Sequence, residues 1–191
     1  MKNGFYDDIW SPVEGCLNGC EYCYARKELA QYGKSFEPIF YKERLSEVAK
    51  MRIGVHFVTH YCDLMGDWVP AEWIEKVIAE CKALPRHTFL FISKNPKRYW
   101  EFVWPGNCIL GVTVESPNEF HRAEAILRLP YRKMCSIEPI MGSFEGYNFN
   151  QFELVVIGAV TGQKHKSLIT EVNSVVHPNI YYKHTVRQYL I

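Results

Sequence analysis

The chain has 191 residues, of which 48% are hydrophobic and 23% charged, a composition typical of a globular protein and not of a disordered one. This length predicts a single domain over residues 1–191. The formal net charge of +1 excludes a protein whose overall charge draws it to nucleic acid or to an acidic membrane, and leaves room only for a local basic patch.

The start of the chain lacks the apolar core of a signal peptide, and no later stretch approaches the length of a membrane-spanning helix. The seven cysteines are an odd number, which does not suit a framework of disulfides. We therefore expect a cytoplasmic protein without a membrane partner, whose thiols stay reduced.

A run of three cysteines follows the first expected strand, Ile9–Val13. Cys16, Cys20 and Cys23 have the spacing C-x3-C-x2-C, and no fourth cysteine lies close by. A cluster of four irons can be held by three thiolates that leave the fourth iron open, by extension of the rule that reactive metal sites keep a free position. A helix expected at Glu21–Tyr32 begins inside the run.

Zinc is the main alternative for this run, because three cysteines and one histidine can close a tetrahedral site. Zinc sites usually take their cysteines from two separate C-x2-C pairs, whereas this chain has one group of three. The seven histidines leave a distant fourth ligand open. Cys81 and Cys108 lie in apolar segments and are expected to be structural thiols. The residues favour iron and sulfide and keep zinc as the alternative.

The second expected strand, Val55–His60, carries two histidines four residues apart. On a strand this spacing predicts that His56 and His60 share a face. A zinc protease pair with the same spacing needs a helix and an intervening glutamate, so that class of enzyme is excluded.

Strands and helices alternate along the rest of the chain. A helix is expected at Pro70–Lys82, where a proline opens the first turn and apolar residues recur at helical spacing. The remaining segments are strands at Thr88–Ser93, Ile109–Glu115, Lys133–Glu138, Leu154–Gly158 and Ile180–Lys183, and a helix at Asn118–Leu129. Alternation with nearly continuous apolar strands predicts a parallel sheet covered on both faces. A full eight-fold barrel needs about 250 residues, so a partial, open barrel fits this chain better, and a doubly wound open sheet stays open as the alternative.

Polar residues end several of these strands: Ser93 and Lys94, Glu115, Glu138, and Lys183. The carboxyl ends of strands build the active site in parallel barrels. Because side chains alternate, Glu115 should share the inner face with Thr113, and Glu138 with Ser136. Val112, Val114, Cys135 and Ile137 should then pack against the helices.

The cysteine run resembles the signature of the radical S-adenosylmethionine (radical SAM) superfamily, C-x3-C-x-aromatic-C, with Tyr22 in the aromatic position. Further stretches between Ile9 and Lys183 resemble a small radical SAM-like family of phages and bacteria that is labelled as a domain of unknown function. That family is distantly similar to the spore photoproduct lyases. The stretches are Asn18–Ala25, Asp63–Met65, Ile92–Arg98, Gly111–Glu115, Ser136–Pro139 and Tyr182–Lys183.

The resemblance implies a partial (β/α)6 barrel of the TIM type, open on one side, with the cysteine loop after the first strand. It implies an enzyme in which Cys16, Cys20 and Cys23 hold a [4Fe–4S] cluster. This cluster reductively cleaves S-adenosylmethionine to a 5′-deoxyadenosyl radical, which abstracts hydrogen from an unidentified substrate. The substrate is a nucleic acid, a protein or a nucleotide-like molecule, and a reductant such as flavodoxin or ferredoxin supplies the electron.

The groups of S-adenosylmethionine suggest partners among the strand-end residues. Lys94 suits its carboxylate, and Glu115 suits the ribose hydroxyls, as a carboxylate does in dinucleotide sites. Asp63, or else the backbone carbonyls near Thr59–Tyr61, is the candidate for the amino group, although the stretch around Asp63 departs from the glycine-rich stretch of the superfamily. Tyr22 and Val160 are the candidates for adenine.

Two further interpretations remain open at this point. Cys62 is either a buried small side chain or a donor of a hydrogen atom or electron during radical chemistry. The alternative for the whole protein is a non-catalytic module that binds zinc or a cluster and attaches to nucleic acid. Its basic segments Lys94–Arg98 and Lys164–Lys166 would then contact phosphates.

Overall fold

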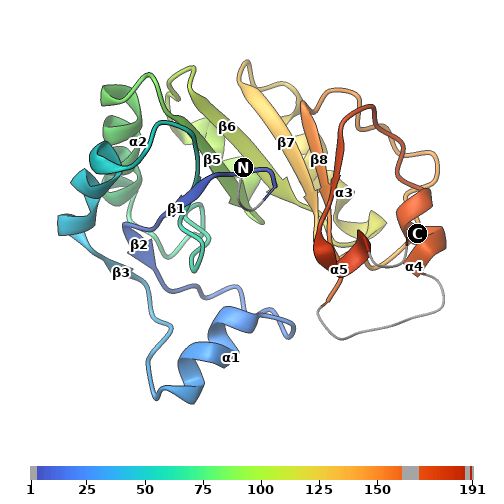
Figure 1. Cartoon of the computed structure of the whole chain (residues 1–191), viewed down its shortest axis with the longest axis horizontal. Coiled ribbons are helices and arrows are strands. Elements are labelled where there is room, and N and C mark those ends of the chain that lie inside the picture. The colour runs from blue at the N-terminus through green and yellow to red at the C-terminus, as the bar shows by residue number, and fades with distance from the viewer. Residues whose placement is uncertain (1–3, 161–167, 188–189, 191) are drawn as a thin grey trace.

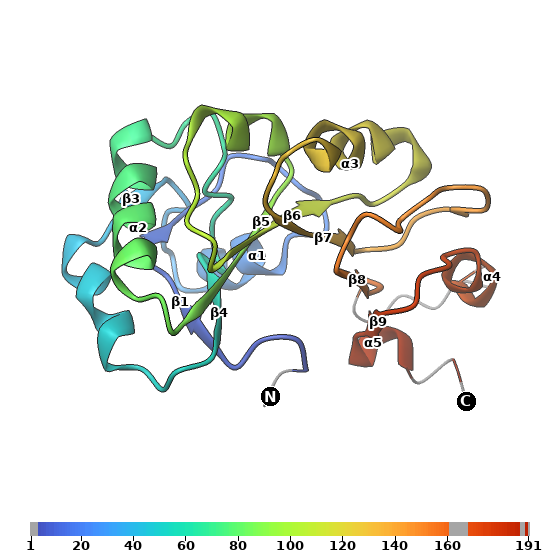
Figure 2. The ribbon, with the colours of Figure 1, turned by 90° about the horizontal axis from the view of Figure 1, so that it is seen from above.

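The computed structural model describes residues 4–160, 168–187 and 190, so the basic segment at 164–166 lies outside the described residues. Seven parallel strands form one curved sheet whose spatial order equals their order in the chain (Figure 1). They are β1 (Asp8–Trp10), β4 (Val55–Val58), β5 (Thr88–Ser93), β6 (Cys108–Thr113), β7 (Arg132–Ile137), β8 (Leu154–Ile157) and β9 (Ile180–Tyr182). In a doubly wound sheet the strand order reverses at a switch point. The chain therefore folds as a partial TIM-like barrel, open between β1 and β9, as predicted (Figure 2).

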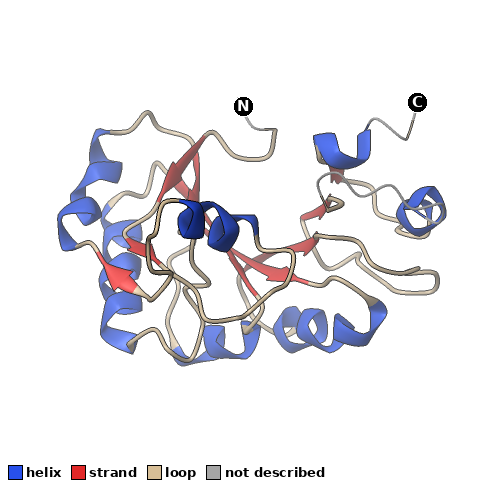
Figure 3. Ribbon diagram, turned by 90° about the horizontal axis from the view of Figure 1, so that it is seen from below, coloured by secondary structure: helices blue, strands red, loops and turns tan. Residues whose placement is uncertain are grey.

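The helices are α1 (Tyr24–Gln31), α2 (Ala71–Ala83), α3 (Phe120–Leu127), α4 (Leu168–Asn173) and α5 (His184–Arg187), with 3-10 segments at Lys42–Lys50, Pro96–Glu101 and Pro117–Glu119. Helices α2 and α3, which are labelled in Figure 2, follow the outer side of the row of strands (Figure 3). No helix in the described ranges is both long and apolar enough to cross a membrane.

The first expected strand is divided in the structure. β1 ends at Trp10, and Val13 belongs to β2 (Val13–Glu14), which pairs antiparallel with β3 (Ile39–Phe40). This small ribbon carries the chain away from the barrel before the cysteine run. The other six strands lie within two residues of their expected bounds.

Side chains alternate across the central strands as expected. Val112, Val114, Cys135 and Ile137 are buried in the larger core, between the sheet and the outer helices. A smaller core of Phe5, Leu90, Met134 and Val156 fills the inside of the barrel. The ring of Phe5, before β1, packs against Tyr181 of β9 with centroids 5.3 Å apart. The inner core thus joins the two edge strands and forms the floor beneath the carboxyl ends of the strands.

The prediction that His56 and His60 share a face is wrong. His56 is fully buried in the outer layer, where its Nε2 lies 2.7 Å from Nδ1 of His87. His60 lies beyond the end of β4 and lines the cavity described below. The backbone of Thr59 between them has φ of 58°, a left-handed conformation uncommon for a β-branched residue, and this breaks the alternation.

The buried histidine pair predicts a loss of stability in mild acid. Burial, and then the neighbouring His87, lower the pKa of His56, against the smaller opposing effect of Asp8 and Asp7. The unfolded chain therefore binds a proton more readily than the folded chain, and the free energy of unfolding should decrease as pH falls below about 6.5. Urea unfolding at neutral and mildly acidic pH should show a smaller decrease in His56→Gln than in the wild type. The same substitution at the exposed His121 is the control, and an equal decrease in all three proteins would contradict the assignment.

Candidate functional site

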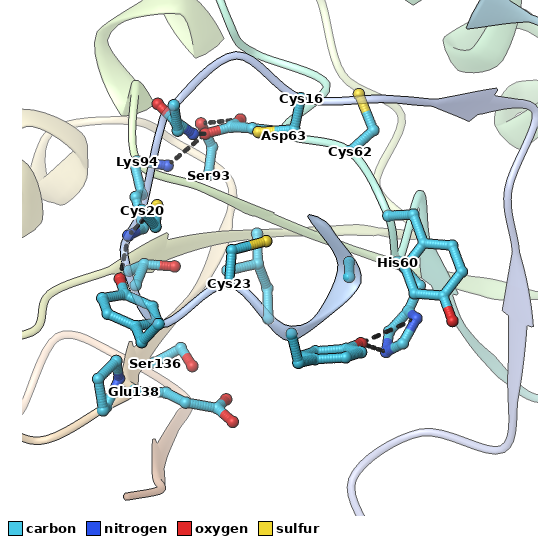
Figure 4. A pocket seen from close by; sticks show the side chains of 18 of the residues that line it. Cys16, Cys20, Cys23, His60, Cys62, Asp63, Ser93, Lys94, Ser136 and Glu138 are labelled. Carbon is cyan, nitrogen blue, oxygen red and sulfur yellow. Dashed lines mark hydrogen bonds between the residues drawn. The ribbon is translucent and has the colours of Figure 1, made fainter. Parts of the chain in front are cut away.

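A cavity of about 460 Å³ lies at the carboxyl ends of the strands, between the sheet and the cysteine run (Figure 4). This volume lies within the range of small-molecule sites. The cavity is lined by all the predicted site residues except Glu115, namely Cys16, Cys20, Tyr22, Cys23, Cys62, Asp63, Lys94 and Val160. Ser93, Glu138 and Lys183 line it too, as expected for polar residues at strand ends.

The loop that carries the cysteines is fixed to the barrel by backbone contacts. Gly15 N donates to Tyr61 O at 3.1 Å, and Cys16 N donates to Phe36 O at 3.0 Å. Gly15 has φ of 91°, and an added Cβ would lie 2.1 Å from Glu37 O, so only glycine fits this turn. Arg26 of α1 donates from Nη2 to Cys16 O at 2.6 Å. The position of the thiols is thus set by the fold.

Cys16, Cys20 and Cys23 are unpaired thiols, each partly exposed toward the same cavity. Cys23 caps α1, and its Sγ accepts a hydrogen bond from Arg26 N at 3.4 Å. Burial raises the pKa of the Cys16 thiol, so a bound metal would have to displace its proton.

The three thiols do not converge on one point. In the part of the chain that the structure describes, no three histidine, cysteine or carboxylate side chains are grouped so that they could hold a single metal ion. The cysteines of an iron–sulfur cluster bind different iron atoms, so their sulfurs stand apart around the cluster. Three thiols on the wall of one cavity fit this type of group.

Glu115 lies at the centre of a charged network behind the cavity wall. Its Oε1 accepts hydrogen bonds from the Tyr22 hydroxyl and from Lys94 Nζ, and its Oε2 lies 2.7 Å from Arg122 Nη1. Burial raises the pKa of Glu115, but the bonds from Lys94 and Tyr22 and the charge of Arg122 outweigh it and hold that pKa below its usual value. Lys94 Nζ also lies 3.1 Å from Cys20 Sγ. Tyr22, Lys94 and Glu115 thus meet beside the cysteine run.

Asp63 is almost completely buried, and both of its carboxylate oxygens are occupied. Oδ1 accepts from Ser93 Oγ at 2.6 Å and from Met65 N at 3.2 Å. Oδ2 accepts from Asn18 Nδ2 and Lys94 N, both at 2.9 Å. Asp63 therefore ties the cysteine loop to the end of β5, a contribution that residue type alone did not indicate.

A second group of polar residues stands at another part of the cavity. Lys183 Nζ lies 2.5 Å from Glu138 Oε1, and the Tyr24 hydroxyl lies 2.5 Å from His60 Nε2. Burial, and then the positive charge of Lys183, lower the pKa of His60. Cys62 is partly buried, and burial raises the pKa of its thiol. The sequence did not single out Tyr24 or Arg122 as site residues. The only indication was that each lies near a predicted site residue along the chain, Tyr24 beside Cys23 and Arg122 seven residues after Glu115.

The chain was compared with protein families and with proteins of curated annotation. The chain matches the family model described as "Protein of unknown function (DUF5131)" over residues 2–177. No protein with curated annotation matches it.

Among solved structures, the chain is similar to mutants of spore photoproduct lyase, a radical SAM enzyme, at 14% identity. A mutant with dinucleoside spore photoproduct has a TM-score of 0.58, covering 78% of this chain and 54% of that one. A mutant with bound AdoMet and dinucleoside spore photoproduct has a TM-score of 0.52, covering 69% and 45%. The chain thus spans about half the length of these lyases, and the likeness is one of fold.

Proposed function

We propose that this chain, which belongs to the DUF5131 family of proteins of unknown function, is a radical SAM enzyme. The observation that carries the proposal is the position of Cys16, Cys20 and Cys23. All three line one cavity at the carboxyl ends of a partial barrel, where parallel barrels place their chemistry. The fold shared with spore photoproduct lyases supports it.

The three cysteines would hold a [4Fe–4S] cluster. When bound, this group supplies the electron, received from a flavodoxin or ferredoxin, that splits S-adenosylmethionine into methionine and a 5′-deoxyadenosyl radical. The chain itself binds and orients the sulfonium compound and keeps water away from it. The substrate that loses a hydrogen atom is a nucleic acid, a protein or a nucleotide-like molecule.

The charged network would bind the rest of S-adenosylmethionine. Lys94 neutralises the carboxylate, and Glu115 accepts hydrogen bonds from the ribose hydroxyls, while Arg122 holds Glu115 in place. Tyr22 and Val160 border the adenine. Asp63 already accepts four hydrogen bonds, so we assign it to holding the cysteine loop instead of binding the amino group.

Anaerobic reconstitution with iron and sulfide tests the function. The protein should turn brown, bind about four irons per chain, and release methionine and 5′-deoxyadenosine from S-adenosylmethionine once reduced. Metal analysis, the visible absorption spectrum and chromatography of the products measure these outcomes. A colourless protein with one bound zinc and no cleavage would contradict the proposal and favour a zinc module.

A further inference from the structure

Glu138 and Lys183 form an ion pair that spans an intervening strand. Glu138 follows β7 and Lys183 follows β9, with β8 between them. Gly158, just beyond β8, leaves the space in which they meet. An added Cβ there would lie 3.0 Å from Lys183 Cδ and 3.2 Å from Glu138 Cγ and Cδ. The pair therefore packs closely over the glycine that follows the strand between its partners.

Stability does not account for this arrangement. The two side chains keep 30% and 34% of their surface exposed, and both line the cavity. An ion pair as exposed as this one contributes little to folding, because water screens the charges and both side chains lose freedom. The pair places a strong hydrogen-bond donor, the Lys183 ammonium, beside a strong acceptor, the Glu138 carboxylate, at the cavity wall.

Aromatic rings line the same cavity. Phe5, Tyr6 and Phe57 form a continuous series, with ring centroids 5.0 Å and 5.5 Å apart. Phe57 lies in turn 5.8 Å from the ring of His60, which pairs with Tyr24. Aromatic side chains can stack with planar rings, and proteins bind nucleobases in this way.

We propose that Glu138, Lys183 and this aromatic series form a subsite for a planar heterocycle of the nucleobase type. Lys183 donates to a ring carbonyl or ring nitrogen, and Glu138 accepts from the adjacent N–H of the same edge. The assignment of this ring to the substrate rests on the proposed function. If the ring belongs to the substrate, the substrate is a molecule that carries a nucleobase. Binding of the ring itself requires neither the cluster nor S-adenosylmethionine.

The test uses cluster-free protein and the four common ribonucleosides as probes, titrated at up to millimolar concentration and followed by ligand-observed NMR. At least one nucleoside should bind. The matching analogue in which methyl groups replace the donor hydrogens of that edge (N3-methyluridine, N1-methylguanosine, N6,N6-dimethyladenosine or N4,N4-dimethylcytidine) should bind about tenfold more weakly or worse, because methylation removes the donor that faces Glu138. No binding by any nucleoside, or equal binding of the methylated analogue, would overturn the subsite.

Two variants and a matched control locate the binding. Glu138→Gln and Lys183→Met should each weaken nucleoside binding about tenfold or more. Glu153→Gln is the control, because Glu153 pairs with Arg132 at the amino ends of β7 and β8, away from the cavity, and this variant should bind as the wild type does. Unchanged binding in both site variants would overturn the proposal. If one variant does not fold, the other variant and the methylated analogue still test whether the subsite binds the ring.

Failure of the subsite and failure of the proposed function give different results. Reconstituted protein that cleaves S-adenosylmethionine while the cluster-free protein binds no nucleoside would overturn the subsite alone. Edge-specific nucleoside binding by a protein that never assembles a cluster would support the subsite and overturn the radical SAM function.

Discussion

Replacing Cys20 with alanine should remove most of the iron and sulfide from the reconstituted protein and abolish cleavage of S-adenosylmethionine. With two thiolates left, one iron loses its protein ligand, and the loop offers no other thiol close by to replace it. Loss of an outer-shell partner already costs a metal site about 10- to 100-fold, so loss of a ligand should reduce cleavage at least about 100-fold. Iron and sulfide content and the rate of 5′-deoxyadenosine release measure the effect.

Cys62→Ala is the matched control for that variant. Cys62 lines the same cavity but lies outside the cysteine run, so its loss should leave the iron and sulfide content unchanged. Circular dichroism should show that both variants remain folded, because Cys20 and Cys62 are only partly buried. A Cys20→Ala protein that keeps its brown colour, or a Cys62→Ala protein that loses it, would show that the ligand set is different.

The sequence predicted the strands of the barrel well because they carry a local signal, whereas the choice of a barrel over a doubly wound sheet came from the family resemblance. Apolar runs bounded by turns mark each strand, and period-two alternation separates Val112 and Cys135, which pack outward, from Thr113 and Ser136, which face the cavity. The prediction was wrong where a long-range contact or an unusual backbone conformation sets the direction of a side chain. The left-handed backbone of Thr59 places His60 on the face opposite to the predicted one. No local sequence pattern predicts this conformation at a threonine.

In the candidate site too, the sequence predicted some residues, while others could be found only from the structure. Residue type and spacing were enough to select Cys16, Cys20 and Cys23, which meet in one cavity. Arg122 reaches Glu115 from a different element, a contact that only the packing of α3 against the sheet creates. Gly158 matters for the space it leaves between two other strands, and that is a property of three segments together. Such contributions become visible once the strands are placed side by side.

Replacing Glu115 with glutamine should weaken the binding of S-adenosylmethionine while leaving the cluster intact. The ribose hydroxyls would lose a charged acceptor, worth about 1.5–3 kcal/mol, or roughly a 10- to 100-fold increase in the dissociation constant. Glu115 is not one of the three proposed cluster ligands, so iron content and colour should match the wild type. Equilibrium binding to the reconstituted protein measures the change. Glu101→Gln, at the exposed partner of Arg98, is the control.

The same variant separates the binding role of Glu115 from its role in the fold. Lys94 and Arg122 would lose their shared counterion, and because they are partly exposed we expect a loss of about 1–3 kcal/mol in the free energy of unfolding. The lowered pKa of Glu115 means that its contribution is present above the unfolded pKa of about 4.3 and is lost as pH falls through the folded value. The stability difference between Glu115→Gln and the wild type should therefore shrink in acid. A stable variant with unchanged affinity would remove Glu115 from the cofactor site, whereas weaker binding in a variant of wild-type stability would assign it to the ligand alone.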